Sequence, residues 1–185
     1  MDELKAGPLF WIDSADSQPC IGTAGVITWK FEVFGKLFHS GLPHQGINSI
    51  EMATDALNFI QQKFYSEFPR HPNEDKYNFA TCSTLKPTQI SCSPGSLNQL
   101  PPSCTVQGDI RLSPFYDVKD VKRAVDRYVQ ELNEDPSVIE NPAHGPHSKY
   151  TLPNEGRKGR IELTWISEGE NGVACNLESQ VTCCA

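Results

Sequence analysis

The feature of this sequence that most constrains its fold is the order in which two kinds of hydrophobic periodicity follow one another. The first is a long alternation of apolar and polar residues at positions 22–36, GTAGVITWKFEVFGK. A period of two residues is typical of a strand with one buried face. We therefore expect a long half-buried strand here. Its apolar face would carry Ile27, Trp29, Phe31 and Val33, and its other face Val26, Thr28, Lys30, Glu32 and Phe34.

Helical spacing follows this alternation. Apolar residues recur three and four positions apart over residues 50–64, which predicts an amphipathic helix. Asn48 and Glu51 stand three positions apart just before and within this pattern, as in a capping box, so the helix should begin there. We expect it to end near Phe68, because a proline follows.

A second apolar stripe covers residues 118–132 and predicts a second helix. Asp117 precedes the stripe as a candidate N-cap, and Asp120 adds a carboxylate to the first turn, where the helix dipole favours negative charge. This helix should end near Asp135, which a proline follows.

Three more segments, residues 79–91, 104–112 and 160–166, have the composition or alternation of strands, and residues 70–76 are expected to be a polar linker. The resulting order, β-α-β-β-α-β, is the split βαβ pattern. We therefore expect an α+β, ferredoxin-like sandwich in which two helices cover one face of a four-stranded antiparallel sheet. This fold does not identify a function, because regulatory, RNA-binding and enzyme accessory domains all use it.

Length and charge narrow the classes of function. The 185 residues are enough for one packed domain. The formal charge of −7 repels phosphate backbones and acidic membrane surfaces. No stretch approaches the ~20 apolar residues of a membrane span, and the first residues lack the pattern of a signal peptide. We expect a soluble protein that binds neither nucleic acid nor membrane and is cytoplasmic by default; an organelle would require a targeting peptide in a complete relative.

The seven cysteines form no CxxC pair, so a zinc knuckle or a CxxC redox motif is not indicated. Cys82, Cys92 and Cys104 fall in expected strands. We expect them to be reduced and to act as small buried apolar residues.

The loop between the first strand and the first helix has an unusual composition. Residues 35–50, GKLFHSGLPHQGINSI, contain two histidines, three glycines and a proline. His39 would lie near a helix N-terminus, where unpaired N–H groups favour an anion or a developing oxyanion. The alternative is a histidine at a strand end whose ring is satisfied by the backbone.

The residue order in this loop resembles the segment G-K-x-x-H-S-x-x-P-H-x-G-x-N-A-I of the acetylornithine deacetylase, desuccinylase and carboxypeptidase family of zinc hydrolases. Residues 95–114, GSLNQLPPSCTVQGDIRLSP, resemble the second lid segment of the same family, and residues 11–20, WIDSADSQPC, resemble the end of its metal-binding domain. The resemblance extends over residues 4–179 and is greatest to the eukaryotic acetylornithine deacetylase branch. It identifies the chain as a lid, or peptidase dimerisation, domain.

The resemblance implies roles for three lid residues. The family's equivalent of His39 crosses the dimer into the partner's active site, where it donates a hydrogen bond to the scissile carbonyl oxygen as that oxygen becomes an oxyanion. The equivalents of Asn98 and Arg111 help to hold the substrate, and an arginine suits a carboxylate because its planar fork pairs two oxygens.

Two of these residues have ordinary structural alternatives. Arg111 leaves a strand and could simply pair with Asp109 or Asp117. Asn98 lies in a turn near prolines and could bond to its own backbone. We assign His44 to shaping the loop.

A fourth residue, Asp13, matches a metal-ligand carboxylate of the family. The complete enzyme would hold two zinc (or cobalt) ions, bound also by a His-x-Asp segment, a Glu-Glu pair and a late histidine. None of these three elements occurs here, so we expect this chain alone to bind no metal. His71, His144 and His147 are expected to be ordinary surface residues.

The resemblance divides the chain into three parts. Residues 1–21 and 170–185 would be remnants of the metal-binding catalytic domain, the latter with a tail, VTCCA, unlike the family, and residues 22–169 the lid. The chain could be a fragment, a truncated gene model or a natural short form. We expect it to be inactive alone and to serve as the lid and homodimer contact of a hydrolase of N-acylated amino acids such as N-acetylornithine, which supplies arginine biosynthesis.

Two other functions remain open. A non-catalytic module could pair with itself or with a full-length relative through an edge strand and an outer helix face. An RNA-binding domain of the same topology would need basic residues and exposed aromatic residues on its central strands, and residues 105–112 supply one arginine and no aromatic residue.

Overall fold

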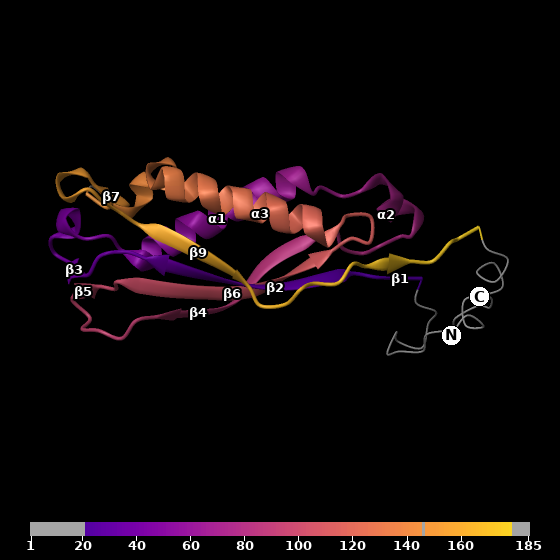
Figure 1. Cartoon of the computed structure of the whole chain (residues 1–185), viewed down its shortest axis with the longest axis horizontal. Coiled ribbons are helices and arrows are strands. Elements are labelled where there is room, and N and C mark those ends of the chain that lie inside the picture. Colours follow the sequence, from indigo (N-terminus) through magenta and orange to yellow (C-terminus); the bar gives the residue numbers. More distant parts are fainter. Residues whose placement is uncertain (1–20, 146, 179–185) are drawn as a thin grey trace.

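The centre of the molecule is a four-stranded antiparallel sheet. The computed structural model describes residues 21–145 and 147–178. The strands follow one another across the sheet in the order β4-β6-β2-β9. Their bounds are Thr84–Cys92 for β4, Ser103–Leu112 for β6, Gly25–Phe34 for β2 and Arg160–Trp165 for β9. Two long helices, α1 (Ser49–Glu67) and α3 (Val118–Glu134), lie beside each other over this sheet (Figure 1). The expected mixed fold with a four-stranded antiparallel sheet is confirmed.

Alternating burial along β2 explains why the helices cover one face of the sheet. Buried and half-buried residues alternate over all ten positions of the strand. The buried set is the apolar face expected from the sequence, Ile27, Trp29, Phe31 and Val33. The neighbouring strand β6 continues this face with Cys104, Val106, Ile110 and Leu112. Gly108 lies opposite Trp29, and a Cβ atom there would come within 2.6 Å of the indole ring, so this position favours glycine.

The two helices begin as the sequence predicts. The side chain of Asn48 accepts a hydrogen bond from the Ile50 N–H at 3.1 Å, and that of Asp117 accepts one from the Lys119 N–H at 2.7 Å. Helix α1 ends at the C-cap Phe68, as expected. The expected capping box is wrong in one respect: the Glu51 carboxylate accepts a hydrogen bond from the Ser148 hydroxyl, and no bond to the Asn48 backbone is found.

The segment between α1 and β4 differs from its prediction. The expected linker contains a one-turn helix, α2 (Pro72–Lys76), which begins with a capping box between His71 and Glu74. The expected strand at residues 79–91 begins only at Thr84. The proline at the first position of α2 and the carboxylate three residues after the cap are ordinary helix-start signals, but so short a pattern is easily read as a loop.

Short paired strands extend the molecule at both ends. At one end β1 (Gly22–Thr23) pairs with β10 (Val173–Ala174), and at the other β3 (Phe38–His39) pairs with β5 (Gln99–Leu100). Strands β2 and β6 run between these ends over ten residues each, a span of roughly 30 Å. Figure 1 shows β3 and β5 at one end of the long axis and β1 at the other.

The remaining elements are short. They are the strand pair β7 (Thr151–Leu152) and β8 (Arg157–Lys158), and the 3-10 helices η2 (Pro43–Gln45), η3 (Pro136–Ile139), η4 (Pro142–His144) and η5 (Pro153–Glu155). Within the residues that the structure describes, no helix combines the length and apolar character needed to cross a bilayer.

Candidate functional site

The end of the molecule formed by β3 and β5 brings together two of the predicted site residues. His39 is paired with Gln99 between the two strands, and the Ser40 N–H donates to the backbone oxygen of Asn98 at 2.9 Å. Residues 39 and 98 are thus neighbours in space although a helix and a strand separate them in the sequence. Both side chains are exposed, and no hydrogen bond of the Asn98 side-chain amide is found among the described residues.

The His39 ring is held in one orientation by its own loop. Its Nδ1 atom accepts a hydrogen bond from the Gly41 backbone N–H at 3.0 Å. A backbone N–H can only donate, so a neutral His39 carries its proton on Nε2. The exposed Nε2–H is therefore free to donate to an oxygen atom outside this domain. The alternative expected from the sequence, a ring satisfied by the backbone, holds for one of the two nitrogens only.

Exposed apolar side chains lie in the two segments that carry His39 and Asn98. Leu37 and Leu42 are 46% and 44% exposed, and Leu97, beside Asn98, is completely exposed. Large apolar side chains that gather at the tip of a domain mark a surface that meets another molecule or another domain. The tip thus combines a hydrogen-bond donor with groups that would exclude water from it.

Arg111 lies at the other end of the sheet. It is paired with Val26 on β2 and Thr84 on β4, and Ser103 lies eight positions earlier on β6, a distance of roughly 27 Å. Its Nε atom donates to the Asp109 carboxylate at 2.7 Å, as the structural alternative predicted, yet the Arg111 side chain remains 59% exposed. A cavity of about 180 Å³ beside it is lined also by Phe79, Ser113 and Gly22. Within one chain, Arg111 and His39 do not form one site.

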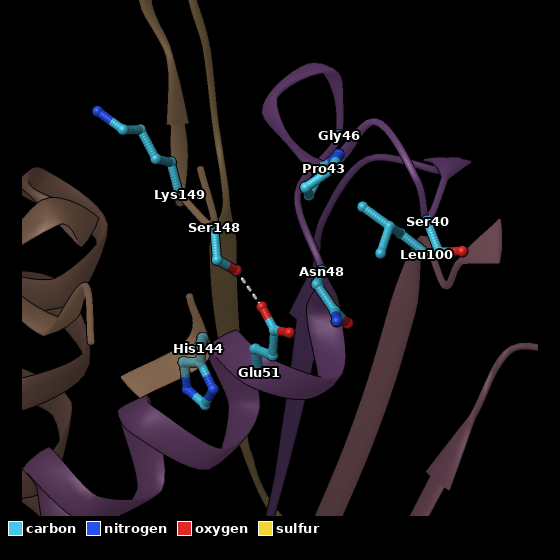
Figure 2. A pocket seen from close by; sticks show the side chains of 9 residues that line it. All are labelled: Ser40, Pro43, Gly46, Asn48, Glu51, Leu100, His144, Ser148 and Lys149. Atoms are coloured by element: carbon cyan, nitrogen blue, oxygen red, sulfur yellow. Dashed lines mark hydrogen bonds between the residues drawn. The ribbon is translucent and has the colours of Figure 1, made fainter. Parts of the chain in front are cut away.

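A cavity of about 260 Å³ lies between the His39 loop and the N-terminus of α1. Figure 2 shows Glu51 from α1 and Ser148 from the loop before β7 pointing toward one another, joined by the hydrogen bond noted above. Ser40 and Asn48 come from the His39 loop, and Lys149 completes the charged lining. The His39 loop and the residues His144, Ser148 and Lys149 therefore line the same cavity.

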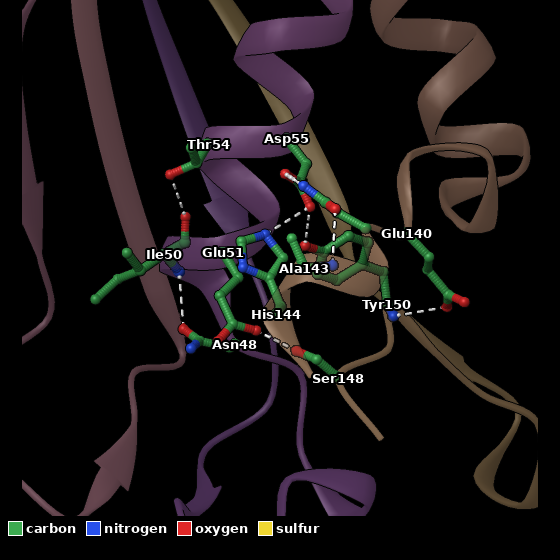
Figure 3. Close-up of polar contacts among 11 residues, drawn as sticks. Asn48, Ile50, Glu51, Thr54, Asp55, Glu140, Ala143, His144, Ser148 and Tyr150 are labelled. Atoms are coloured by element: carbon green, nitrogen blue, oxygen red, sulfur yellow. Dashed lines mark hydrogen bonds and ion pairs between the residues drawn. The ribbon is translucent and has the colours of Figure 1, made fainter. Parts of the chain in front are cut away.

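A buried carboxylate anchors the same region, and the sequence analysis missed it. The Asp55 side chain is 5% exposed and accepts hydrogen bonds from the Tyr150 hydroxyl at 2.5 Å and the Asn141 amide at 3.3 Å (Figure 3). His144 Nε2 lies 3.0 Å from the Asp55 oxygen that also accepts from the Tyr150 hydroxyl. Burial, and then the bond to Asp55, raises the pKa of Tyr150. The signal was an aspartate inside the apolar stripe of α1, because a buried charge needs partners.

Two of the histidines expected to be ordinary surface residues have structural roles. His144 bonds to the buried Asp55, and His71 caps α2 while its ring stacks on Phe115 at 5.1 Å. His147 is exposed as expected. The cysteine prediction holds for Cys104, which is buried, and is wrong for Cys82 and Cys92, which are exposed.

The remaining site prediction concerns the metal. Asp13 lies outside the described residues. Among residues 21–145 and 147–178 no group of three or more His, Cys, Asp or Glu side chains is arranged to hold a metal ion.

Comparison with a protein-family model and with known sequences points to one family. Residues 21–136 match the family described as the peptidase dimerisation domain. The chain is 52% identical to acetylornithine deacetylase from Arabidopsis thaliana and 44% identical to the one from Dictyostelium discoideum, in each case over 97% of this chain and 40% of the relative. The chain thus spans two fifths of the length of these curated relatives.

Solved structures share the fold at low sequence identity. An amidase of the hydantoinase/carbamoylase family from Burkholderia phymatum is similar with a TM-score of 0.59 and 14% identity, over 83% of this chain and 31% of that one. A tripeptidase from Staphylococcus aureus is similar with a TM-score of 0.51 and 16% identity, over 87% of this chain and 33% of that one.

Proposed function

The chain belongs to the peptidase dimerisation domain family, and we propose that it acts as the lid and dimer contact of a metal-dependent amidohydrolase that releases acetate from N-acetylornithine. The identity of 52% and 44% to two acetylornithine deacetylases supports this substrate. Residues 22–169 would form the lid, and the flanking residues 1–21 and 170–185 would belong to the catalytic domain. The strand order β4-β6-β2-β9 with two helices supports the ferredoxin-like assignment of this lid.

One observation carries the proposal: the residues expected to touch the substrate lie at opposite ends of the sheet. His39 and Asn98 cannot reach the substrate that Arg111 of the same chain holds, because roughly 27 Å separates the two ends. A two-fold dimer removes this conflict, since the β3–β5 end of one protomer can then enter the active site beside Arg111 of its partner. The isolated chain would present half of each site.

Each lid residue has a chemical role in this arrangement. The Nε2–H of His39 would donate to the scissile carbonyl oxygen and stabilise the negative charge that develops on it. The Asn98 amide would bind a polar group of the same substrate, and Arg111 would pair with its carboxylate, exchanging Asp109 for the ligand or sharing the guanidinium with it. Leu37, Leu42 and Leu97 would exclude water around these bonds.

Two zinc or cobalt ions, bound by the catalytic domain with Asp13 as one ligand, would supply the activated water. Among the described residues no group of three or more His, Cys, Asp or Glu side chains is arranged to hold these ions.

The second half of the edge strand β4 is our candidate for the dimer contact. All residues of β4 after Leu85 are exposed. Lys86 and Pro87 protect the first half of the strand against pairing, whereas residues 88–92 carry neither a charge nor a proline. Such an unprotected edge can pair with its own copy and continue the sheet.

A complementation experiment tests the proposal. We would replace the equivalent segment of the Arabidopsis thaliana enzyme by residues 21–178 of this chain and measure hydrolysis of N-acetylornithine. His39→Ala should lower kcat by about 10²–10³, because one oxyanion donor is lost. His147→Asn is the control for loss of an exposed histidine. It removes an edge contact with the His44 ring at 6.0 Å but leaves the His39 donor in place, its φ of 81° is one that asparagine tolerates, and it should lower kcat far less than His39→Ala.

Mixed dimers then test whether the site is shared between protomers. One protomer carries His39→Ala, and the other an intact lid with its catalytic glutamate in the metal-binding domain replaced. If His39 acts across the dimer, mixing the two inactive proteins restores one working site of two. Mixtures that stay inactive, although mixed dimers are present, would contradict the proposed arrangement.

A non-catalytic function is the second candidate, favoured by the exposed residues along the second half of the edge strand β4. A lid without a metal-binding domain could form mixed dimers with a full-length relative and lower its activity. Co-expression with such a relative that changes neither its activity nor its mass in solution would exclude this function.

A further inference from the structure

Two cysteines face each other at the base of the segment that carries Asn98. Cys92 ends β4, Cys104 lies at the start of β6, and the two are directly opposite in the strand register. Their Sγ atoms are 3.8 Å apart. Opposite residues of an antiparallel pair point to the same face of the sheet. The fold therefore places two thiols in contact at this edge.

The backbone geometry at this pair suits a disulfide bond. The neighbouring Ser93 N–H donates to the Ser103 oxygen at 3.0 Å, which makes residues 93 and 103 a hydrogen-bonded pair. Because hydrogen-bonded pairs alternate with closely spaced ones, Cys92 and Cys104 form the latter type, with Cα atoms about 4.5 Å apart. Disulfides span Cα distances of about 4.4–6.8 Å. Rotation of the two side chains is enough to bring the sulfur atoms together.

The two thiols have different access to reagents. Cys92 is exposed, whereas Cys104 is only 1% exposed. Burial, and then the neighbouring Cys92, raises the pKa of the Cys104 thiol to about 12. Cys104 is thus a protonated thiol at neutral pH, and a dissolved oxidant meets Cys92 first. Cys82 and Cys175 are also exposed, but no thiol contact is found for them among the described residues.

We propose that Cys92 and Cys104 form a reversible thiol–disulfide site that is oxidised by a small disulfide such as glutathione disulfide. The Cys92 thiolate attacks one sulfur of glutathione disulfide, forming a mixed disulfide and releasing one glutathione thiolate. Cys104 then loses its proton and attacks the Cys92 sulfur, releasing the second glutathione. The two cysteines lose two protons and two electrons, and glutathione disulfide accepts both electrons.

The cross-link would act on the lid tip. It closes a loop over residues 93–103, which contains Asn98 and the strand β5 that pairs with β3 at His39. Closing a short loop restrains the open states of the segment. Pairing of the β4 edge with another chain uses backbone groups, whereas the Cys92 sulfur lies on a face of the sheet, so the site does not depend on the proposed function or on the dimer.

Peptide mapping under non-reducing conditions tests this inference on the whole purified chain. The reduced protein is incubated with glutathione disulfide, and dithiothreitol is added to a second portion afterwards. We expect a cross-link between Cys92 and Cys104 that dithiothreitol removes, with glutathione on Cys82 and Cys175 serving as internal controls for exposed cysteines. A wild type in which Cys92 keeps its glutathione and Cys104 stays unmodified would overturn the proposal.

Two variants separate the steps of the reaction. Cys104→Ser should accumulate glutathione on Cys92, because no thiol resolves the mixed disulfide. In Cys92→Ser, Cys104 should stay unmodified, and the protein should melt at the same temperature before and after oxidation. The oxidised wild type, in contrast, should melt several degrees higher than the reduced wild type. This second comparison holds even if Cys104→Ser does not fold. Equal melting of both wild-type forms after complete cross-linking would refute the restraint on the lid.

Discussion

At the scale of single residues, the buried Asp55 fixes how Asn141, His144 and Tyr150 lie on α1. Tyr150→Phe removes the hydroxyl that donates to this carboxylate, and it should lower the free energy of unfolding by about 1–3 kcal/mol, because a buried acceptor loses a partner. Tyr77→Phe, which removes an exposed hydroxyl bond to the Cys175 oxygen, is the control and should cost less. Urea unfolding measures both. Equal losses would mean that the Asp55 cluster is not a special anchor.

The same cluster predicts a dependence on alkaline pH. The pKa of Tyr150 in the folded protein is raised by burial and by Asp55 above the value of about 10 in the unfolded chain. The unfolded chain therefore loses this proton first as pH rises. The contribution of the Tyr150 hydroxyl to the free energy of unfolding is therefore fully present below about pH 10 and falls above it. Unfolding curves of the wild type and of Tyr150→Phe should consequently converge at high pH, and a constant difference would contradict this assignment.

The sequence predicts the individual site residues unequally. His39 and Asn98 follow from motif resemblance, and the structure brings them together. The network of Asp55, Tyr150 and His144 joins residues almost a hundred positions apart, so no local pattern contains it. The contact of Cys92 and Cys104 is equally invisible until the register of β4 and β6 is known, since a shift of one residue would move the thiols to opposite faces.

At the scale of elements, Glu67 near the end of α1 connects this helix to α3. It accepts hydrogen bonds from the Tyr128 hydroxyl at 2.5 Å and the Arg127 guanidinium at 2.6 Å. These two bonds lower the pKa of Glu67, and the bond from Tyr128 has the larger effect. The stabilisation is present above the unfolded pKa of about 4.3 and is lost as pH falls through the lower folded value. It should not exceed about 1 kcal/mol, because the side chain is 42% exposed.

Thermal melting of Glu67→Gln tests this link. The variant should melt below the wild type at pH 7, and the difference should shrink as pH falls through the lowered pKa of the folded Glu67, because the carboxylate then takes up a proton. Glu168→Gln is the control, since Glu168 is fully exposed with Lys122 at 3.9 Å, and its curve should follow the wild type throughout. A difference in melting temperature that stays constant over the whole acid range would assign the effect to packing instead of charge.

The sequence predicts helices best where a long hydrophobic periodicity begins at a capping residue. Both long helices meet this condition, and their N-caps are confirmed. The strand β2 has the long periodicity alone, and it is confirmed as well. The region of residues 70–83 fails this condition, because α2 has one turn and the residues before β4 carry strand-forming side chains without a partner strand. Short elements depend on contacts that only the folded chain supplies, here the stacking of His71 on Phe115.

At the scale of the whole molecule, the separation of His39 from Arg111 makes dimerisation the property on which the proposed function depends. If β4 is the pairing edge, Ile90→Lys should convert a dimeric chain into a monomer, because it places a charge in the unprotected half of that strand. Sedimentation of the purified chain over a range of concentrations measures the mass. Ile166→Lys, beyond the opposite edge strand β9, is the matched control, since Ile90 and Ile166 are 62% and 55% exposed.

The opposite result would move the dimer contact to the other edge of the sheet. If Ile166→Lys is monomeric and Ile90→Lys is still dimeric, the contact lies at the β9 edge, and the active site would still need two protomers. A wild type that is monomeric at every concentration would instead mean that residues outside this chain hold the dimer together.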